Sequence, residues 1–407
     1  MSLHHEQSVD LTDLSSFIDG TENELFARLR ADEPLHWNDE QNGPGFWSVT
    51  RYADLLRVVN DPQTFVNGQG TQIPSRLVEG GTPTVHNTDP PRHGKLRKLA
   101  APHLRAVKVR EWQELIDRAV STILDDLEAR SAADGEVEFV HHAAALLPIQ
   151  VLGQVLGVPL EDCGLLLDWT NRIVSDDPEF MRGPDEKERA RAEMFAYFQQ
   201  LTEARRAEPR NDMVSKLVRA ELDGEPLDWA DLAAYYFVLV GAGNETTRNL
   251  ITGTVLAFAD FPDQWDALVA DRSLLRPAIE EMLRWVTPIR AMRRTATTDV
   301  TWDDGQVIKA GDKVVCWFQA ANRDPEVFAD PDVVRIDRTE NEHVGFGWGI
   351  HACMGSHLAR AEVTTFFQQV LERGLRIVPV GPPERLHTNQ FHAFKRLRVR
   401  IEKEGAS

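Results

Sequence analysis

The spacing of apolar and polar residues along the chain follows two periods, and the helical period of about 3.6 residues dominates. Helical patterns occur at 22–31, 52–59, 112–129, 186–207 and 276–285. The strand period of two is confined to short segments at 45–51, 298–315 and 397–401. A turn signal at Asp303-Asp-Gly305 inside the second of these predicts a hairpin. The pattern therefore predicts a mainly α fold with smaller β-sheets.

One segment, at 227–259, departs from the amphipathic rule. It is apolar almost all round, which predicts a buried helix, and Asp228 is a suitable N-cap for it. Its centre, Gly241-Ala-Gly-Asn-Glu-Thr-Thr247, disfavours a helix. A glycine there costs about 1 kcal/mol against alanine, and Asn and Thr compete for backbone hydrogen bonds. Such a local conflict indicates a kink, a functional position, or both.

The domain organisation follows from the absence of sequence repeats and low-complexity linkers. Residues 1–20 are polar, which predicts a flexible N-terminal segment. Residues 21–407 are expected to form a single large domain. Inside it, residues 66–88 are rich in Gly, Thr and Pro and show no period. A loop of that length in a compact domain is uncommon and often functional.

Composition narrows the class of protein. The hydrophobic content of 42% is ample for a core, and no apolar run is long enough to span a membrane. The first residues show no secretory signal. A formal charge of −19 argues against nucleic acid and anionic membranes as partners. Three cysteines without a pairing pattern favour a reducing compartment. We therefore expect a soluble, cytoplasmic protein without a membrane anchor.

The most informative stretch is Phe346-Gly-Trp-Gly-Ile-His-Ala-Cys-Met-Gly355, followed by Leu358-Ala-Arg-Ala-Glu362. A lone cysteine is usually a small buried hydrophobe, and a glycine-rich loop is usually a turn. The complete pattern is far more specific and resembles the haem-binding loop of the cytochrome P450 superfamily. The resemblance implies that Cys353 is the axial thiolate on haem iron. It places Phe346 near the sulfur and His351 at a haem propionate. It also places Gly347 and Gly355 in the haem-binding loop.

Two further motifs resemble the same family. His93 and Arg97 are four residues apart after Asp89-Pro, and spacing alone gives only a basic helix face. The resemblance implies that both bind haem propionates, together with Arg294. The run Ala242-Gly-Asn-Glu-Thr-Thr247 resembles the family's oxygen-activation motif. It implies that Glu245 and Thr246 are the acid–alcohol pair that delivers protons, and that Ala242 and Gly243 lie over the haem.

A fourth motif, Glu281-x-x-Arg284, is almost uninformative alone but stands in the family's order. By resemblance the pair belongs to a buried, structural salt-bridge network with an arginine from a later stretch. The sequence departs from the family here, because Val333 stands where that arginine is usual. We choose Arg338 as the third member, with Arg335 as the alternative.

The resemblance spans roughly residues 45–401 and implies a monooxygenase of the soluble bacterial class. The expected cofactor is haem b, iron protoporphyrin IX, with dioxygen as cosubstrate. The chain shows no flavin, iron–sulfur or nucleotide motif, so electrons must come from outside. A ferredoxin and its reductase are the expected partners. A basic island is a candidate docking patch for an acidic protein, although such clusters are often only solvated. Its members are Arg92, Lys95, Lys98, Arg105, Lys108 and Arg110.

The candidate substrate contacts are mainly apolar. The one charged candidate, Arg290, either binds a carboxylate of the substrate or lies outside the substrate cavity. They are Val238, Ile289, Arg290, Ala291, Met292, Phe391 and Phe394. Two features look like actinobacterial members that oxidise sterol side chains, terpenoids or branched lipids: Ala-Gly-Asn-Glu-Thr-Thr-Arg-Asn and Pro-Gly-Phe-Trp-Ser-Val-Thr-Arg-Tyr. The alternatives are oxidation of a polyketide, macrolide or aromatic product, a peroxide-driven peroxygenase, and a haem sensor without turnover.

Overall fold

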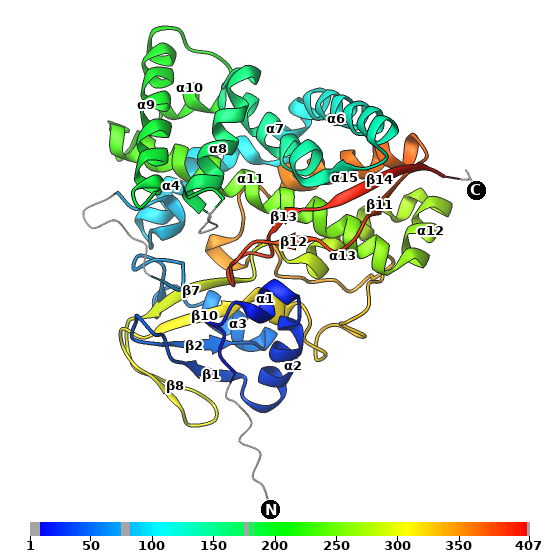
Figure 1. Cartoon of the computed structure of the whole chain (residues 1–407). Coiled ribbons are helices and arrows are strands. Elements are labelled where there is room, and N and C mark those ends of the chain that lie inside the picture. The colour runs from blue at the N-terminus through cyan, green and yellow to red at the C-terminus, as the bar shows by residue number, and fades with distance from the viewer. Residues whose placement is uncertain (1–8, 75–81, 175–178, 182, 405–407) are drawn as a thin grey trace, which may run out of the picture.

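The computed structural model describes residues 9–74, 82–174, 179–181 and 183–404. A smaller part built around a β-sheet lies at the bottom of Figure 1, and a larger helical part fills the top. The longest helix, α11 (Trp229–Asp260), runs through the middle of the molecule. The predicted mainly α architecture is confirmed.

The helical part consists of antiparallel and crossing helices, three of which the apolar pattern predicted, at 112–129, 186–207 and 276–285. They are α4 (Arg92–Ala100), α6 (Gln113–Asp134), α7 (Leu146–Leu156), α8 (Cys163–Val174), α9 (Glu186–Ala207), α10 (Met213–Val218), α12 (Pro262–Ala270), α13 (Leu275–Val286) and α15 (Ser356–Glu372). Helix α11 packs against α7, α8, α13 and α15, so it joins two hydrophobic clusters. This central position explains why α11 is apolar on almost every side.

The main sheet has the order β1-β2-β10-β7-β3 and brings together distant parts of the chain. Its strands are β1 (Leu35–Asn38), β2 (Phe46–Val49), β3 (Phe65–Val66), β7 (Ala291–Ala296) and β10 (Lys313–Trp317). Strand β10 pairs in parallel with β2 and antiparallel with β7. Helices α1 (Ser15–Asp19), α2 (Glu22–Asp32) and α3 (Tyr52–Val59) lie beside this sheet (Figure 1).

The remaining strands form small sheets in both parts of the molecule. A three-stranded sheet has the order β11 (Leu375–Pro379), β14 (Arg398–Lys403), β4 (Val137–Glu138). Strands β12 (Glu384–Arg385) and β13 (Phe394–Arg396) pair, as do β5 (Glu221–Leu222) and β6 (Glu225–Pro226). The predicted hairpin around Gly305 is present as β8 (Val300–Thr301) and β9 (Val307–Ile308).

The N-terminal segment differs from its prediction as a loose tail. Residues 1–8 lie outside the described residues, but residues 9–20 pack onto the main sheet. Leu11 and Phe17 are completely buried, and the Phe17 ring stacks on Trp317 with 5.9 Å between centroids. The three buried apolar residues of this segment, Val9, Leu11 and Phe17, show no recognisable period. Their burial depends on a strand about 300 residues away, which local pattern does not reveal.

Helix α11 is continuous from Trp229 to Asp260, so its glycines do not break it. The Asp228 side chain caps it as expected, accepting the Asp231 N–H at 2.8 Å. A Cβ on Gly243 would lie 2.9 Å from a methyl group of Leu152 on α7. Glycine at this position therefore allows two helices to approach closely. The expectation that Gly243 lies over a haem stays a prediction beside this packing role.

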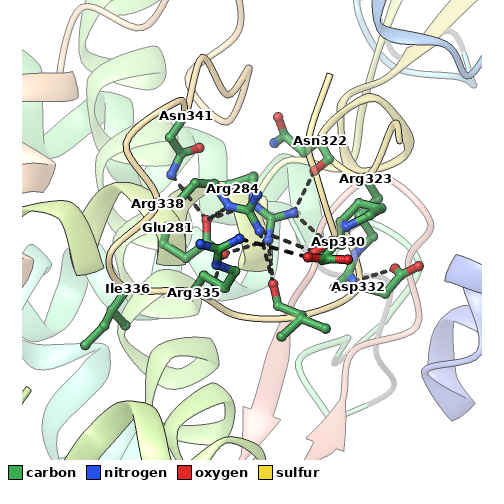
Figure 2. A network of polar contacts seen from close by, with 12 residues as sticks. Glu281, Arg284, Asn322, Arg323, Asp330, Asp332, Arg335, Ile336, Arg338 and Asn341 are labelled. Atoms are coloured by element: carbon green, nitrogen blue, oxygen red, sulfur yellow. Dashed lines mark hydrogen bonds and ion pairs between the residues drawn. The ribbon is translucent and has the colours of Figure 1, made fainter. Parts of the chain in front are cut away.

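The predicted structural network is built around the Glu281 carboxylate, which is completely buried (Figure 2). Its two oxygens accept two bonds from Arg284, at 2.7 and 2.8 Å, and one from Arg338 Nε at 3.0 Å. Arg335 contributes only its backbone N–H, at 2.9 Å. The structure thus places Arg338, not Arg335, at the carboxylate. Val333, at the position where the family usually has the arginine, joins the network through its backbone. Its carbonyl oxygen accepts hydrogen bonds from Arg284 and Arg338.

Candidate functional site

The loop before α15 presents Cys353 at the end of a tight turn. The Cys353 N–H donates to the Phe346 carbonyl at 2.9 Å and closes the loop. Gly347 and Gly349 have φ of +67° and +69°, the left-handed region that favours glycine. A Cβ on Gly349 would also lie 2.9 Å from the Val59 carbonyl oxygen on α3. The loop geometry therefore requires the glycines at positions 347 and 349.

Cys353 differs from the two other cysteines of the chain. Cys163 and Cys316 are buried, whereas the Cys353 side chain faces open space. Burial of its surroundings raises the pKa of the Cys353 thiol, and the backbone N–H groups of Gly355 and Ser356 act in the opposite direction. Such donors stabilise a thiolate and tune it as a metal ligand. The sulfur is thus accessible, and two backbone N–H groups lie where they favour its thiolate form.

Basic side chains from three elements gather next to this loop. The His93 ring on α4 lies 4.0 Å from the His351 ring, centroid to centroid. Arg97, one turn later, donates to the Ala352 carbonyl at 2.6 Å. Arg294 on β7 is 5% exposed. Burial and the charges of Arg294, His93 and Arg97 lower the pKa of His351 to about 2. The structure therefore brings together all four residues predicted to hold propionates.

A polar atom of this basic cluster is left without a partner within the described part of the chain. His351 Nε2 is buried and has no hydrogen-bond partner among the residues that the structure describes. The carboxylate of Asp89 lies nearby, but its oxygens already accept the N–H groups of Asn67 and Gly68. Two arginines and two imidazole rings that can donate N–H groups, beside an accessible thiol, fit a ligand with carboxylates and a thiophilic metal. Haem, with two propionates and an iron atom, satisfies both requirements.

Sequence reasoning missed one member of the cluster, His86. It precedes the Asp89-Pro motif and carries no signal of its own. Its Nδ1 lies 3.0 Å from the Thr84 hydroxyl, and its carbonyl accepts from Asn67 at 2.8 Å. Burial and the nearby Arg294 charge lower the pKa of His86 to about 4. A neutral imidazole is therefore expected there at neutral pH.

Glu245 and Thr246 are consecutive residues in the middle of α11, but their side chains have different hydrogen-bond partners. The Thr246 hydroxyl donates to the Ala242 carbonyl at 2.9 Å. Glu245 is only 4% exposed and forms an ion pair with Arg248, one turn later on the same helix. Asn249 also donates to Glu245, at 3.2 Å. The carboxylate is thus held by its own helix and not by the neighbouring hydroxyl.

Arg248 and Asn249 connect this carboxylate to the surrounding elements. Arg248 donates to Asn171 on α8 at 3.1 Å. The Asn249 side-chain oxygen accepts the Phe394 N–H on β13 at 3.1 Å. Sequence reasoning did not single out either residue. The spacing of three and four residues from Glu245 was the available signal, because such residues share a helix face.

The predicted substrate contacts separate into two groups. Ile289 and Phe391 are partly buried and form an isolated antiparallel β-bridge, which joins the segment before β7 to the segment before β13. Met292 is also partly buried, and Val238 on α11 is 9% exposed. These four residues remain candidates. Ala242 is exposed on the same helix as Val238, and Gly241 beside it borders open space.

Arg290, Ala291 and Phe394 are corrected as substrate contacts. Arg290 is 1% exposed, pairs with Glu22 at 2.9 Å and donates to Gln319 at 2.8 Å. It also donates to the carbonyls of Thr388 and Phe391, so its charge is satisfied inside the protein. Ala291 packs into the cluster under α1 and α2, and Phe394 into the core around α6 and α15.

The basic island on α4 and the segment after it is partly neutralised. Arg92 pairs with Asp231 at 2.6 Å, and Lys95 pairs with Asp223 at 2.6 Å. Lys108 pairs with Glu111 at 2.7 Å. Half of the six predicted charges are therefore balanced within the chain. The Lys95 and Lys108 pairs are exposed on both sides and contribute little to stability, whereas the Asp231 side chain is only 14% exposed.

A cavity of about 310 Å³ lies elsewhere, between α11, α12, α15 and β11. Val255, Trp265 and Phe367 are among its lining residues. Val255 is nine residues after Thr246, roughly 14 Å along the axis at 1.5 Å per residue. The cavity is therefore distinct from the centre formed by Cys353, the basic cluster and Thr246.

Comparisons with known proteins agree with this geometry. Residues 171–389 match the family model described as Cytochrome P450. The chain is 35% identical to linalool 8-monooxygenase of Pseudomonas putida, over 96% of this chain and 98% of that protein. It is 34% identical to steroid C26-monooxygenase of Mycolicibacterium smegmatis, over 94% of this chain and 92% of that protein.

A solved structure is similar over the whole fold. It is Mycobacterium marinum cytochrome P450 CYP268A2 in complex with pseudoionone, with a TM-score of 0.87 and 34% identity. The match covers 97% of this chain and 99% of that one. Among the described residues, no helix combines the length and apolar character needed to cross a membrane.

Proposed function

This chain belongs to the cytochrome P450 family, and from that premise we propose that it hydroxylates an apolar terpenoid or sterol side chain with electrons from a ferredoxin. It is an oxygen-incorporating oxidoreductase by its family. The observation that carries the site assignment is the buried basic cluster around the unpartnered His351 Nε2, beside the accessible Cys353 sulfur. The proposed compartment is the cytoplasm, where three free cysteines stay reduced.

Five side chains of this protein would hold haem b. Cys353 would supply the thiolate, and His93, Arg97, Arg294 and His351 would bind the two propionates. When bound, a haem thiolate supplies the reductive splitting of dioxygen, with one oxygen atom entering a substrate C–H bond and the other leaving as water. Cation–carboxylate hydrogen bonds would fix the orientation of the ring.

The acid–alcohol pair would deliver protons over the haem. The Thr246 hydroxyl donates its proton in a hydrogen bond to the Ala242 carbonyl. The oxygen of this hydroxyl can therefore still accept a hydrogen bond from a proton donor. Glu245 faces Arg248 and must change partners before it can pass a proton to Thr246. Positioned acid–base groups of this kind contribute roughly 10²- to 10⁴-fold to a rate.

Replacing Thr246 with alanine should uncouple the reaction. We expect the fraction of consumed electrons recovered in hydroxylated product to fall by about 10-fold or more, with hydrogen peroxide replacing the product. The haem content and the CO-bound spectrum should be unchanged. The measurement is nicotinamide consumption against product and peroxide, with an added ferredoxin and reductase.

Thr254→Ala is the matched control, because the Thr254 hydroxyl donates to the Leu250 carbonyl at 2.7 Å in the same four-residue pattern. It lies two turns further along α11 and should stay coupled. Tight coupling in Thr246→Ala, or equal uncoupling in both variants, would contradict the proton-delivery role of Thr246.

The substrate proposal rests on apolar lining residues and on the relatives. Val238, Ile289, Met292 and Phe391 offer no charge, and Arg290 is satisfied inside the protein. The named relatives oxidise linalool and steroids, and the similar solved structure contains pseudoionone. Spin-shift titration with terpenoids, sterols, fatty acids, macrolides and small aromatics tests the proposal. Activity confined to macrolides or small polar aromatics would overturn it.

The ferredoxin proposal is tested by the source of electrons. Turnover should need dioxygen, a ferredoxin and reduced nicotinamide, because the Glu245–Thr246 pair serves proton delivery to dioxygen. Efficient turnover with peroxide alone would favour the peroxygenase. Ligand binding without turnover under either condition would favour a sensor.

A further inference from the structure

A bidentate ion pair joins α13 to α15 beside the Cys353 loop. Glu280, next to the buried network on α13, accepts from Arg360 Nε at 2.6 Å and from Arg360 Nη2 at 2.7 Å. His343 Nε2 lies 3.0 Å from the same carboxylate. The side chains of Glu280 and Arg360 are 35% and 34% exposed, and His343 is 4% exposed. The group is thus half-buried, so solvent ions screen its charges less than they screen fully exposed charges.

This group contacts the residue that the sequence places against the sulfur. The Arg360 guanidinium carbon lies 4.5 Å from the centroid of the Phe346 ring, a cation–π contact. His343 Nδ1 accepts the Gly345 N–H at 3.1 Å, which fits a neutral ring with its proton on Nε2. Phe346 in turn accepts the Cys353 N–H through its carbonyl. Three short steps therefore connect Glu280 to Cys353.

The loop also rests directly on α13. A Cβ on Gly345 would lie 2.7 Å from the Leu283 carbonyl oxygen, so the backbone at this point has no room to shift toward the helix. Glu280 and Leu283 are neighbours on one face of α13, three residues apart. The backbone just before Phe346 therefore rests on α13, and the Phe346 ring contacts the Arg360 guanidinium.

The charges of the group act on the sulfur in opposite directions. Arg360 is among the positive charges that oppose the rise in the pKa of the Cys353 thiol caused by burial. Burial raises the pKa of Glu280, but Arg360 and His343 outweigh it and hold that pKa at about 2. Glu280 is therefore ionised at neutral pH and cancels most of the Arg360 charge. A protein that needed only a cation–π contact would not require this carboxylate.

We propose that Glu280 and Arg360 are positioning residues that set the net charge beside the Cys353 sulfur and thereby the reduction potential of the haem bound there. The inference rests on the proposed haem-thiolate function. Reduction adds one electron next to the sulfur, so a nearby positive charge favours the reduced state and a negative charge opposes it. Arg360 donates to Glu280 and not to the sulfur.

The test is a reductive titration of the holoenzyme, one electron per haem, in four variants. Glu280→Gln leaves the Arg360 charge uncancelled and should shift the potential to more positive values. Arg360→Gln leaves the Glu280 charge and should shift it to more negative values. The double variant restores the net charge and should return close to the wild-type potential. Arg360→Lys keeps the charge and should shift little. The single-variant shifts should shrink at 1 M salt because the pair is partly exposed.

Glu128→Gln is the matched control. Glu128 binds Arg373 at the far end of α15 with similar exposure, 28% and 23%. Arg373 is 13 residues after Arg360, roughly 20 Å along the helix. The control should leave the potential unchanged.

The outcomes separate this inference from the proposed function. Unchanged potentials in Glu280→Gln and Arg360→Gln, or shifts of the same sign, in proteins that keep the thiolate spectrum, would overturn the charge-setting role alone. A wild-type protein without the thiolate spectrum would overturn the haem-thiolate function itself. If one glutamine variant fails to fold, the other glutamine variant, the double variant and Arg360→Lys decide. A large shift in Arg360→Lys or in the double variant would contradict the proposal.

Discussion

Cys353→Ser should abolish turnover while leaving the fold in place. A serine hydroxyl has nearly the size of the thiol but does not ionise at neutral pH, so it cannot replace an anionic sulfur ligand. Loss of groups that merely orient a metal ligand already costs 10- to 100-fold. Loss of the ligand itself should therefore reduce product formation by more than about 100-fold. The measurements are product formation and the absorption spectrum of the reduced, CO-bound protein.

Cys163→Ser provides the control for a cysteine-to-serine change elsewhere. Cys163 is 3% exposed at the start of α8, where burial raises the pKa of its thiol to about 11. It is thus a neutral structural thiol, and its variant should keep both spectrum and activity. Substantial turnover with an unchanged spectrum in Cys353→Ser would mean that another residue binds the iron.

Glu281→Ala should prevent the native protein from accumulating. The carboxylate is completely buried and accepts from Arg284, Arg338, Asn341 and the Arg335 backbone. Removing one partner of a buried ion pair leaves an uncompensated charge, which costs about 3–5 kcal/mol. That is a large part of the net stability of a typical domain. Urea unfolding and the yield of folded protein give the measurement.

Glu203→Ala is the matched control for Glu281→Ala. Glu203 pairs with Arg206 on α9 at the same three-residue spacing, but the two side chains are 62% and 47% exposed. An exposed pair contributes about 0–1 kcal/mol. Equal losses of unfolding free energy in the two variants would show that the buried network is not a main source of stability.

The helices and the haem-binding loop could be predicted because their signals are local. The period of apolar residues gave α9 at Glu186–Ala207 and most of α6 and α13. The glycines around Cys353 stand in a fixed pattern because the loop needs their left-handed backbone at Gly347 and Gly349. Features that depend on a few neighbouring residues are thus well determined by sequence.

The substrate contacts were harder because they depend on which face of a strand is buried. Residues alternate along β7, so Ala291 and Met292 point to opposite sides of the sheet. Arg290 is satisfied by Glu22, which is 268 residues earlier in the chain. No local pattern contains that partner. The choice between Arg335 and Arg338 was also not set by local pattern. The path of the loop between Asp330 and Asn341 determines which arginine side chain reaches Glu281.

The central claim is that Cys353 and the basic cluster bind haem through a thiolate. The absorption spectrum of the reduced, CO-bound wild-type protein tests it most directly. We expect a Soret band at the wavelength diagnostic of thiolate ligation, and its loss in Cys353→Ser with retention in Cys163→Ser. A spectrum typical of histidine or neutral thiol ligation, in protein shown to be folded and freshly reduced, would contradict the account.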